Sequence, residues 1–410
     1  MNASARAMTG GRGRPLVALA LALALALQWI ALHLAHVSLA AHWVALLAGT
    51  GIFGAAFLLS WSAEVAQMDI PQALALAFLA LIAVLPEYSV DIYFAWQAGK
   101  DATYTAFATA NMTGANRLLI GVGWASVVVA FWLKTRRRAI AIGQDHGVEL
   151  FCLLLATAYS FVLPFKRTLS VWDAAILLSI FVFYAVAAVR APVVEPELEG
   201  PAELIATLRA GRRRFVTAVL FALAGTTIVM AAEPFAESLL ETGRHFGVEE
   251  FVLVQWLAPL ASESPEFIVA ILFALRGNAG AAMGTLISSK VNQWTLLIGM
   301  LPLAFGLSAG QFSHPMQLDA RQAEEILLTA AQSLFAVVVL ADFRFSLLEG
   351  AAFFVLFGTQ LLSTNLEFRY CFSFLYLVLT AGLVLFRPEI RRSLWVLMRR
   401  AAARVAVPPM

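Results

Sequence analysis

Long apolar stretches occupy most of this sequence, and they restrict the chain to one class of fold. Of its 410 residues, 61% are hydrophobic and only 13% are charged. A helix needs about 20 apolar residues to cross a bilayer, whereas a spanning barrel strand alternates apolar and polar residues. These stretches do not alternate, so they predict an all-α polytopic membrane protein with about twelve transmembrane helices. The apolar windows are 15–36, 42–64, 71–96, 103–133, 147–165, 169–190, 214–236, 249–275, 279–308, 322–341, 345–364 and 369–387.

Basic residues gather at a few ends of these windows and set the expected orientation. They cluster in 134–138, 209–214 and 387–404, and again ahead of the first window. With an even number of spans all of these clusters fall on one side, which the positive-inside rule assigns to the cytoplasm. We therefore expect both termini to be cytoplasmic and the protein to be integral to a bacterial inner (plasma) membrane. The first window resembles a signal peptide, but its length favours a retained span.

The longest polar connection, 191–213, divides the chain into two halves. We expect an N-terminal cytoplasmic segment with an extra helix, a first repeat, a cytoplasmic linker, a second repeat, and an extra helix with a basic cytoplasmic tail. These segments are 1–41, 42–190, 191–213, 214–364 and 365–410. The net charge of +2 does not suggest a nucleic-acid partner, so the expected partners are the lipid bilayer and inorganic cations. Nothing in the sequence indicates an oligomeric state.

One short motif occurs twice inside the apolar windows. Leu85-Pro86-Glu87-Tyr88 has a counterpart 179 residues later in Ser264-Pro265-Glu266-Phe267. Each copy is followed in the next window by a polar stretch that contains glycine, at 110–121 and 284–294. Ionisable side chains within a membrane are costly to bury and usually mark an ion or proton pathway. Two copies in matching places therefore predict a transporter built from internal repeats.

The residue types in this motif suit cation binding. Proline removes a backbone donor and frees the carbonyl one turn earlier, and freed carbonyls at membrane depth are tolerated where they line a cavity. A carboxylate beside amide and hydroxyl oxygens supplies the ligands that hard cations prefer, Ca²⁺ above all. Two inverted copies are expected to form one site at the midplane that opens alternately to each side.

These motifs resemble the alpha repeats of the calcium/cation antiporter superfamily, the sodium/calcium exchanger-like membrane proteins. That family carries Thr-Ser-x-Pro-Glu in one helix and Gly-Asn-x-x-Gly-Ser-Asn-x-x-Asn/Asp in the next, in both halves. The resemblance covers 43–133 and 220–308. It implies two inverted five-helix repeats, here with one extra helix at each end, and an antiporter that needs no resident cofactor. It also implies that Glu87 and Glu266 are the central ligands of the transported cation.

The further ligands that the resemblance implies are kept mainly in the second half. There Ser262, Ser289 and Gln293 match the family's hydroxyl and amide positions. The matching first-half residues have side chains that cannot coordinate a cation, and they are Ala83, Ala115 and Leu119. The first half does keep the family's two asparagines, as Asn111 and Asn116.

Additional charges surround the two glutamates in sequence. Asp91 lies four residues after Glu87 and Glu263 three before Glu266, so each pair shares a helical face, and we expect Asp91 and Glu263 to be further cation ligands. Lys290 and Arg117 lie within the two polar stretches and are expected charge partners of the site. Four carboxylates against two fixed cations leave two net negative charges, enough to neutralise one divalent cation. We hypothesise that the fixed cations occupy the space of the sodium ions in sodium-coupled relatives, which favours protons as counter-ions.

The sequence therefore predicts a secondary antiporter that moves Ca²⁺ in exchange for Na⁺ or H⁺. Because several first-half ligands are lost, a degenerate membrane scaffold that does not transport is an alternative. An intramembrane enzyme is less favoured, since the chain has no Gly-x-Ser-x-Gly, His-Glu-x-x-His or phosphate-loop motif. A purely structural role is also open for Glu87 and Glu266, as salt-bridge partners of Arg117 and Lys290.

Overall fold

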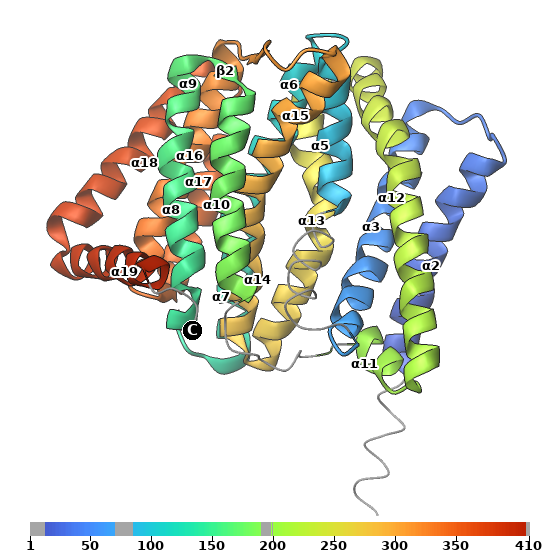
Figure 1. Ribbon diagram of the computed structural model, residues 1–410, viewed down its shortest axis with the longest axis horizontal. Helices are drawn as coiled ribbons and strands as arrows, with labels where there is room; N and C mark the ends of the chain where they lie inside the picture. The colour runs from blue at the N-terminus through green and yellow to red at the C-terminus, as the bar shows by residue number, and fades with distance from the viewer. Residues whose placement is uncertain (1–12, 70–84, 190–197, 199, 407–410) are drawn as a thin grey trace, which may run out of the picture. The chain divides into compact units, whose positions relative to one another are not determined.

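The computed structural model describes residues 13–69, 85–189, 198 and 200–406 (Figure 1). Nearly all of these residues lie in helices, and two very short strand pairs complete the secondary structure of the described part. The chain forms two compact units, of which unit 1 comprises 1–93 and 185–265 and unit 2 comprises 94–184 and 266–410. Each unit therefore combines segments from both halves of the sequence.

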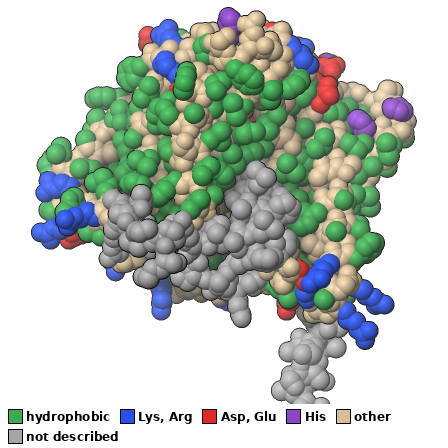
Figure 2. All heavy atoms as spheres, viewed as in Figure 1, with side chains coloured by type: hydrophobic (Ala, Val, Ile, Leu, Met, Phe, Trp, Pro, Cys, Tyr) green, Lys and Arg blue, Asp and Glu red, His purple; other side chains and the backbone are tan. Residues whose placement is uncertain are grey.

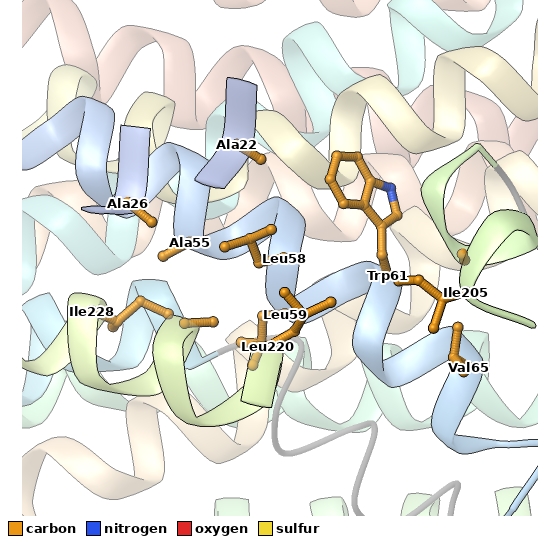
Figure 3. Close-up of a cluster of buried hydrophobic side chains, with 12 residues drawn as sticks. Ala22, Ala26, Ala55, Leu58, Leu59, Trp61, Val65, Ile205, Leu220 and Ile228 are labelled. Atoms are coloured by element: carbon orange, nitrogen blue, oxygen red, sulfur yellow. The ribbon is translucent and has the colours of Figure 1, made fainter. Parts of the chain in front are cut away.

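Unit 1 is built around the pairing of α3 (Ala41–Ala66) with α12 (Ala210–Phe246). α2 (Gly13–Leu34) and the short α11 (Pro201–Ala206) pack against α3. α5 (Leu85–Ala98) begins in this unit, and so does α13 (Glu250–Arg276). Figure 3 shows side chains of α2, α3, α11 and α12 meeting in one apolar cluster. The labelled members are Ala22, Ala26, Ala55, Leu58, Leu59, Trp61, Val65, Ile205, Leu220 and Ile228.

Small residues let α2 and α3 approach closely. A Cβ atom at Gly54 would come within 2.7 Å of the carbonyl oxygen of Ala22. Helices that associate within a membrane gain little from the hydrophobic effect and depend on such close packing. The alternating Leu-Ala sequence of α2 supplies the matching small side chains, Ala22 and Ala26, both buried.

An ion pair fastens the polar ends of α3 and α12. Asp69 follows α3, and its carboxylate accepts hydrogen bonds from Arg213 at 2.7 and 2.8 Å and from Arg214 at 3.0 Å. The hydrogen bonds from Arg213 hold the pKa of Asp69 near 2, below its ordinary value of 3.8. Because the folded pKa is depressed, this stabilisation is present above the ordinary pKa and is lost as the pH falls through about 2.

Unit 2 contains the two longest polar-interrupted windows, and each forms one long helix. The first runs through α6 (Tyr104–Leu118), a π-helical segment η1 (Leu119–Trp124) and α7 (Ala125–Thr135). The second runs through α14 (Ala279–Asn292), a π-helical segment η3 (Gln293–Leu297) and α15 (Ile298–Ala309).

From its length, each of these two windows is expected to form a tilted or a broken helix, and the structure excludes the break. Both helices are continuous, over 32 and 31 residues, and instead of breaking they widen into a π turn at the end of the polar stretch. Such π segments within α-helices are frequent at functional sites, and they recur here at matching places in the two halves.

The remaining helices of unit 2 surround this pair of long helices. α8 (Gly147–Ser160), α9 (Val162–Lys166) and α10 (Val171–Val189) follow the first. α16 (Ala320–Leu340), α17 (Leu347–Gln360), α18 (Leu366–Phe386) and α19 (Pro388–Ala406) follow the second. α16 packs against α6, α8 and α18, and Figure 1 shows α16 and α18 side by side. The predicted basic tail is thus the helix α19, with Ile390 and Leu397 buried.

Two short antiparallel strand pairs join the halves of the sequence within unit 2. β1 (Ala139–Ala141) pairs with β4 (Arg344–Ser346), with Ile140 opposite Phe345. β2 (Thr168–Leu169) pairs with β3 (Met316–Gln317). β1 and β3 follow the long helices of their respective halves, β2 directly precedes α10 and β4 directly precedes α17. β1 therefore corresponds to β3, and β2 to β4. A twofold axis between the halves would turn the β1–β4 pair into the β3–β2 pair, so this pairing favours the predicted repeat.

The described helices confirm the predicted all-α polytopic membrane fold. Within the described ranges nine helices are long and apolar enough to cross a membrane, and α13 makes a tenth if its two parts form one span. α17 is a shorter apolar helix, and most of the predicted window 71–96 lies outside the described residues. The count of twelve therefore stays a prediction. Figure 2 shows hydrophobic side chains covering most of the visible helix surface, as contact with lipid requires.

One glycine in a π segment provides a test of this packing. A Cβ atom at Gly121 would overlap with the ring of the buried Phe357 on α17. We expect Gly121→Ala to lower the free energy of unfolding by about 1–3 kcal/mol, because overpacking forces side chains and backbone to shift. Thermal and denaturant unfolding in detergent measures this. The control is Gly358→Ala in α17, where no atom lies within 4 Å of the new Cβ; equal stability of both variants would contradict the predicted overlap.

Candidate functional site

Four of the predicted site residues belong to unit 1, and all four are buried. Glu87 and Asp91 lie on α5, one turn apart, and Ser262 and Glu263 lie on the unit 1 part of α13. Glu87 is 3% exposed, Asp91 0% and Glu263 2%. The hydroxyl of Ser262 donates to the carbonyl of Ala258 at 3.1 Å, which leaves its oxygen lone pairs available as ligands. Carboxylates removed from water in this way need compensating partners or a bound cation.

Glu266 belongs to unit 2 and lies directly after Pro265 in α13. Ser289 on α14 lies close to its carboxyl group, and the Ser289 hydroxyl forms no hydrogen bond to a described residue. Ser289 itself is buried, and Glu266 is half-buried with one carboxyl oxygen out of contact with solvent. The structure thus brings together the second-half glutamate and one of the hydroxyl ligands that the resemblance implies.

Two amide side chains of unit 2 have unsatisfied polar atoms. Asn111 on α6 and Gln293 at the start of η3 are both 0% exposed. Neither side chain forms a hydrogen bond to any described residue through its oxygen or its nitrogen, and α6 packs against η3. Leaving a buried polar group unsatisfied costs about 1–3 kcal/mol, so such groups call for a water, an ion or a ligand. Both residues were predicted as cation ligands.

The ammonium group of Lys290 is held by oxygen atoms of the first polar stretch. Its Nζ donates to the side-chain oxygen of Asn116 at 2.6 Å and to the main-chain oxygen at 3.1 Å. It also lies 4.7 Å from the ring centroid of Trp294. The amide nitrogen of Asn116 donates to Met112 at 2.8 Å, so both polar atoms of this side chain are already engaged. Asn116, predicted as a ligand of a mobile cation, here binds a fixed one.

The ion pair that the structure describes for Arg117 is with Glu325 on α16. Glu325 also pairs with Arg369 on α18, and all three side chains are almost fully buried. The sequence predicted Arg117 as a charge partner of the Pro-Glu site and did not single out Glu325. A signal was present, because Glu324 and Glu325 both lie inside the apolar window 322–341.

The described residues contain no group of three or more His, Cys, Asp or Glu side chains placed to hold a metal ion. Amide, hydroxyl and carbonyl oxygens can complete a cation site beside carboxylates. Ser289 and Gln293 supply such oxygens at or just before the second π segment, and Asn111 supplies one on α6, which packs against that segment. That chemistry suits a hard cation in transit.

Comparison with known proteins agrees with this chemistry. The sequence matches the family described as "Sodium/calcium exchanger protein" over residues 40–190 and 216–365. The crystal structure titled "H+/Ca2+ Exchanger CAX" is 44% identical, with a TM-score of 0.90 over 95% of this chain and 99% of that one. A search of the curated proteins gave no match.

Two more distant structures share the fold. The sodium-calcium exchanger NCX_Mj is 14% identical, with a TM-score of 0.52 over 78% of this chain and 96% of that one. The structure titled "native YfkE" is 12% identical, with a TM-score of 0.56 over 90% of this chain and 98% of that one. The family and the two structures titled as exchangers are transporters, which confirms the prediction that the chain is not an enzyme. The protein is an integral membrane protein of the sodium/calcium exchanger family, within the calcium/cation antiporter superfamily.

Proposed function

We propose that this protein is an antiporter that exchanges Ca²⁺ for H⁺. The observation that carries the choice of counter-ion is the ammonium of Lys290, bound by the side-chain and main-chain oxygens of Asn116. The similarity to a structure titled as an H⁺/Ca²⁺ exchanger supports the same choice.

A fixed ammonium disfavours sodium for two reasons. It already binds the side-chain and main-chain oxygens of Asn116, which a sodium ion would need as ligands. Its fixed positive charge also takes the place of the charge that one sodium ion would bring. A proton needs no coordination shell and binds a single carboxylate oxygen, so it avoids this conflict.

Calcium is the proposed cargo because of the oxygen donors around the two glutamates. In unit 2, Glu266 has Ser289 beside it, and Asn111 and Gln293 offer buried amide oxygens. In unit 1, Glu87 and Asp91 share a face of α5, and Glu263 lies beside Ser262 on α13. These are the ligand types that Ca²⁺ takes. That the two repeats share one midplane site and open it alternately to each side stays a prediction.

Competition between the two ions explains how they are exchanged. A carboxyl group that holds a proton has lost its charge and binds Ca²⁺ weakly, and one that ligates Ca²⁺ has no proton. The glutamates therefore carry either protons or calcium, and the sodium of other family members is not required. The alternative from the sequence, a degenerate membrane scaffold that does not transport, would show no exchange of protons for calcium.

Transport by the purified protein in liposomes tests the proposal. We expect an acidic lumen to drive Ca²⁺ uptake, and an imposed Na⁺ gradient to leave the rate unchanged. Uptake that depends on Na⁺ and ignores the pH gradient would show that the counter-ion is wrong. Absence of any Ca²⁺ flux from correctly folded protein would favour the non-transporting scaffold.

The role of Lys290 has its own test. We expect Lys290→Asn to create a Na⁺ stimulation of Ca²⁺ transport that the wild type lacks, because it removes the fixed charge and frees the oxygens of Asn116. Lys290→Arg keeps the charge and should show no Na⁺ effect. Lys134→Asn, at an exposed lysine, controls for the change in net charge. If Lys290→Asn folds and responds to Na⁺ no more than Lys134→Asn does, the ammonium does not exclude sodium.

A further inference from the structure

A buried charge cluster in unit 2 is not used by the transport chemistry described above. Glu325 of α16 pairs with Arg117 of α6 through one carboxyl oxygen and with Arg369 of α18 through the other. α16 packs against both partner helices, and α18 lies beside it in Figure 1. One carboxylate thus joins three helices, and the three paired groups carry a net charge of +1.

Glu324, the neighbour of Glu325, has no hydrogen-bond partner among the described residues. Its side chain is 0% exposed, and both carboxyl oxygens are out of contact with solvent. Burying an unpaired polar group costs several kcal/mol, and an unpaired charge costs more. A carboxyl group buried at this cost in free energy calls for a function beyond packing.

The charges that act on Glu324 come from three helices. Arg321 and Glu325 lie on α16 itself, Arg117 on α6 and Arg369 on α18. Charged groups on two other elements packed against α16 are engaged elsewhere. Lys166 of α9 is bound by Asp173, and Glu149 of α8 lies 3.6 Å from His146.

These surroundings favour the binding of a proton, and not of a metal cation, by Glu324. Desolvation favours the neutral carboxyl group of Glu324, whereas the neighbouring arginines favour its carboxylate. An ionised Glu324 would bring the net charge of the cluster with Arg117, Arg369 and Glu325 to zero. Because the two effects oppose each other, both protonation states are accessible. A metal cation would face the arginines at close range and be repelled, whereas a proton adds its charge directly to the carboxylate.

The cluster also touches the segment that carries the fixed ammonium. The main-chain oxygen of Arg117 accepts a hydrogen bond from Gln332 of α16 at 3.4 Å. The preceding residue, Asn116, holds Lys290. A change in the charge of Glu324 therefore acts on Arg117, and through it on the part of α6 next to the proposed cation ligands.

We propose that Glu324 is a proton-binding carboxyl group of this antiporter, additional to the glutamates of the Pro-Glu motifs. The inference rests on the proposed exchange of Ca²⁺ for H⁺. In one half of the cycle a carboxylate oxygen of Glu324 forms an O–H bond with a proton, which neutralises the side chain. In the other half the same bond breaks and the proton leaves. The Arg117–Glu325–Arg369 cluster senses this change in charge and passes it to α6.

The test compares two modes of transport by the full chain in liposomes. One is Ca²⁺ uptake driven by a pH gradient, and the other is exchange of labelled for unlabelled Ca²⁺ without a gradient. We expect Glu324→Gln, which mimics the protonated group, to lower the ratio of the first rate to the second about tenfold, within the usual range of coupling free energies. We also expect it to flatten the pH dependence of that ratio. Glu367→Gln, at an exposed glutamate of α18, is the matched control and should behave as wild type.

The outcomes distinguish failure of the proposed Ca²⁺/H⁺ exchange from failure of the inference about Glu324. If the wild type shows no proton-driven uptake, the proposed function fails before Glu324 is tested. If the wild type is proton-driven and Glu324→Gln keeps the same ratio and pH profile, the inference is overturned while the proposed function stands. If Glu324→Gln does not fold, Glu324→Asp decides, because it keeps a titrating group in a changed position. A shifted pH midpoint in Glu324→Asp supports proton binding, and an unchanged midpoint overturns it.

Discussion

Glu266→Gln is expected to abolish proton-driven Ca²⁺ transport. The substitution keeps the shape of the side chain but removes the charge that binds calcium and the group that takes up the proton. Even groups that only support a metal ligand change affinity by about 10–100-fold when mutated, so we expect losing the ligand itself to lower the rate about 100-fold or more. Isotope flux into liposomes measures the rate, and titration calorimetry in detergent measures Ca²⁺ affinity.

The control for this variant is Glu389→Gln, which makes the same change at an exposed residue of α19. It should transport as the wild type does. A structural role for Glu266 predicts a different pattern, in which the variant loses stability but the folded fraction transports normally. Transport by well-folded Glu266→Gln within a few-fold of wild type would remove this residue from the proposed ligand set.

Glu325→Leu is expected to destabilise unit 2 strongly. The change leaves the guanidinium groups of Arg117 and Arg369 buried without the carboxylate that joins them. Removing one partner of a buried ion pair costs about 3–5 kcal/mol, because the remaining charge is uncompensated. Unfolding by denaturant in detergent measures the loss. The exposed Glu367→Gln again serves as the control and should change stability little.

A triple variant separates the energetic cost of the unpaired charges from the contribution of the whole cluster to the free energy of unfolding. Arg117→Leu and Arg369→Leu, added to Glu325→Leu, remove all three charges and should restore much of the stability, because apolar side chains need no partner at this depth. If the triple variant is as unstable as Glu325→Leu alone, the loss comes from packing and not from charge. Its transport rate then reports whether the cluster serves the proton step or only holds α6, α16 and α18 together.

Several structural features could not be foreseen from the order of the residues. Arg117 and Glu325 are 208 positions apart, and Arg369 is 44 from Glu325. Hydropathy windows report how apolar a stretch is and not which charges meet: Arg117 and Glu325 lie inside the windows 103–133 and 322–341, and Arg369 begins the window 369–387. The π segments were missed for a different reason. They arise from a shift of main-chain hydrogen bonds that no side-chain pattern reports, so the two long windows looked like tilted or broken helices.

The sequence by itself determined the membrane fold, the family and the residue types at the centre of the site. Hydrocarbon forces apolar stretches into helices, and a carboxylate after a proline within such a stretch is rare enough to identify a function. Only the tertiary structure decided which charges meet. In the folded chain the oxygens of Asn116 bind Lys290, and the carboxylate of Glu325 pairs with Arg117 and Arg369. Glu324 has no hydrogen-bond partner among the described residues. The physical reason is that ion pairs in a low-dielectric interior are set by how helices pack, and packing depends on contacts between segments far apart in the chain.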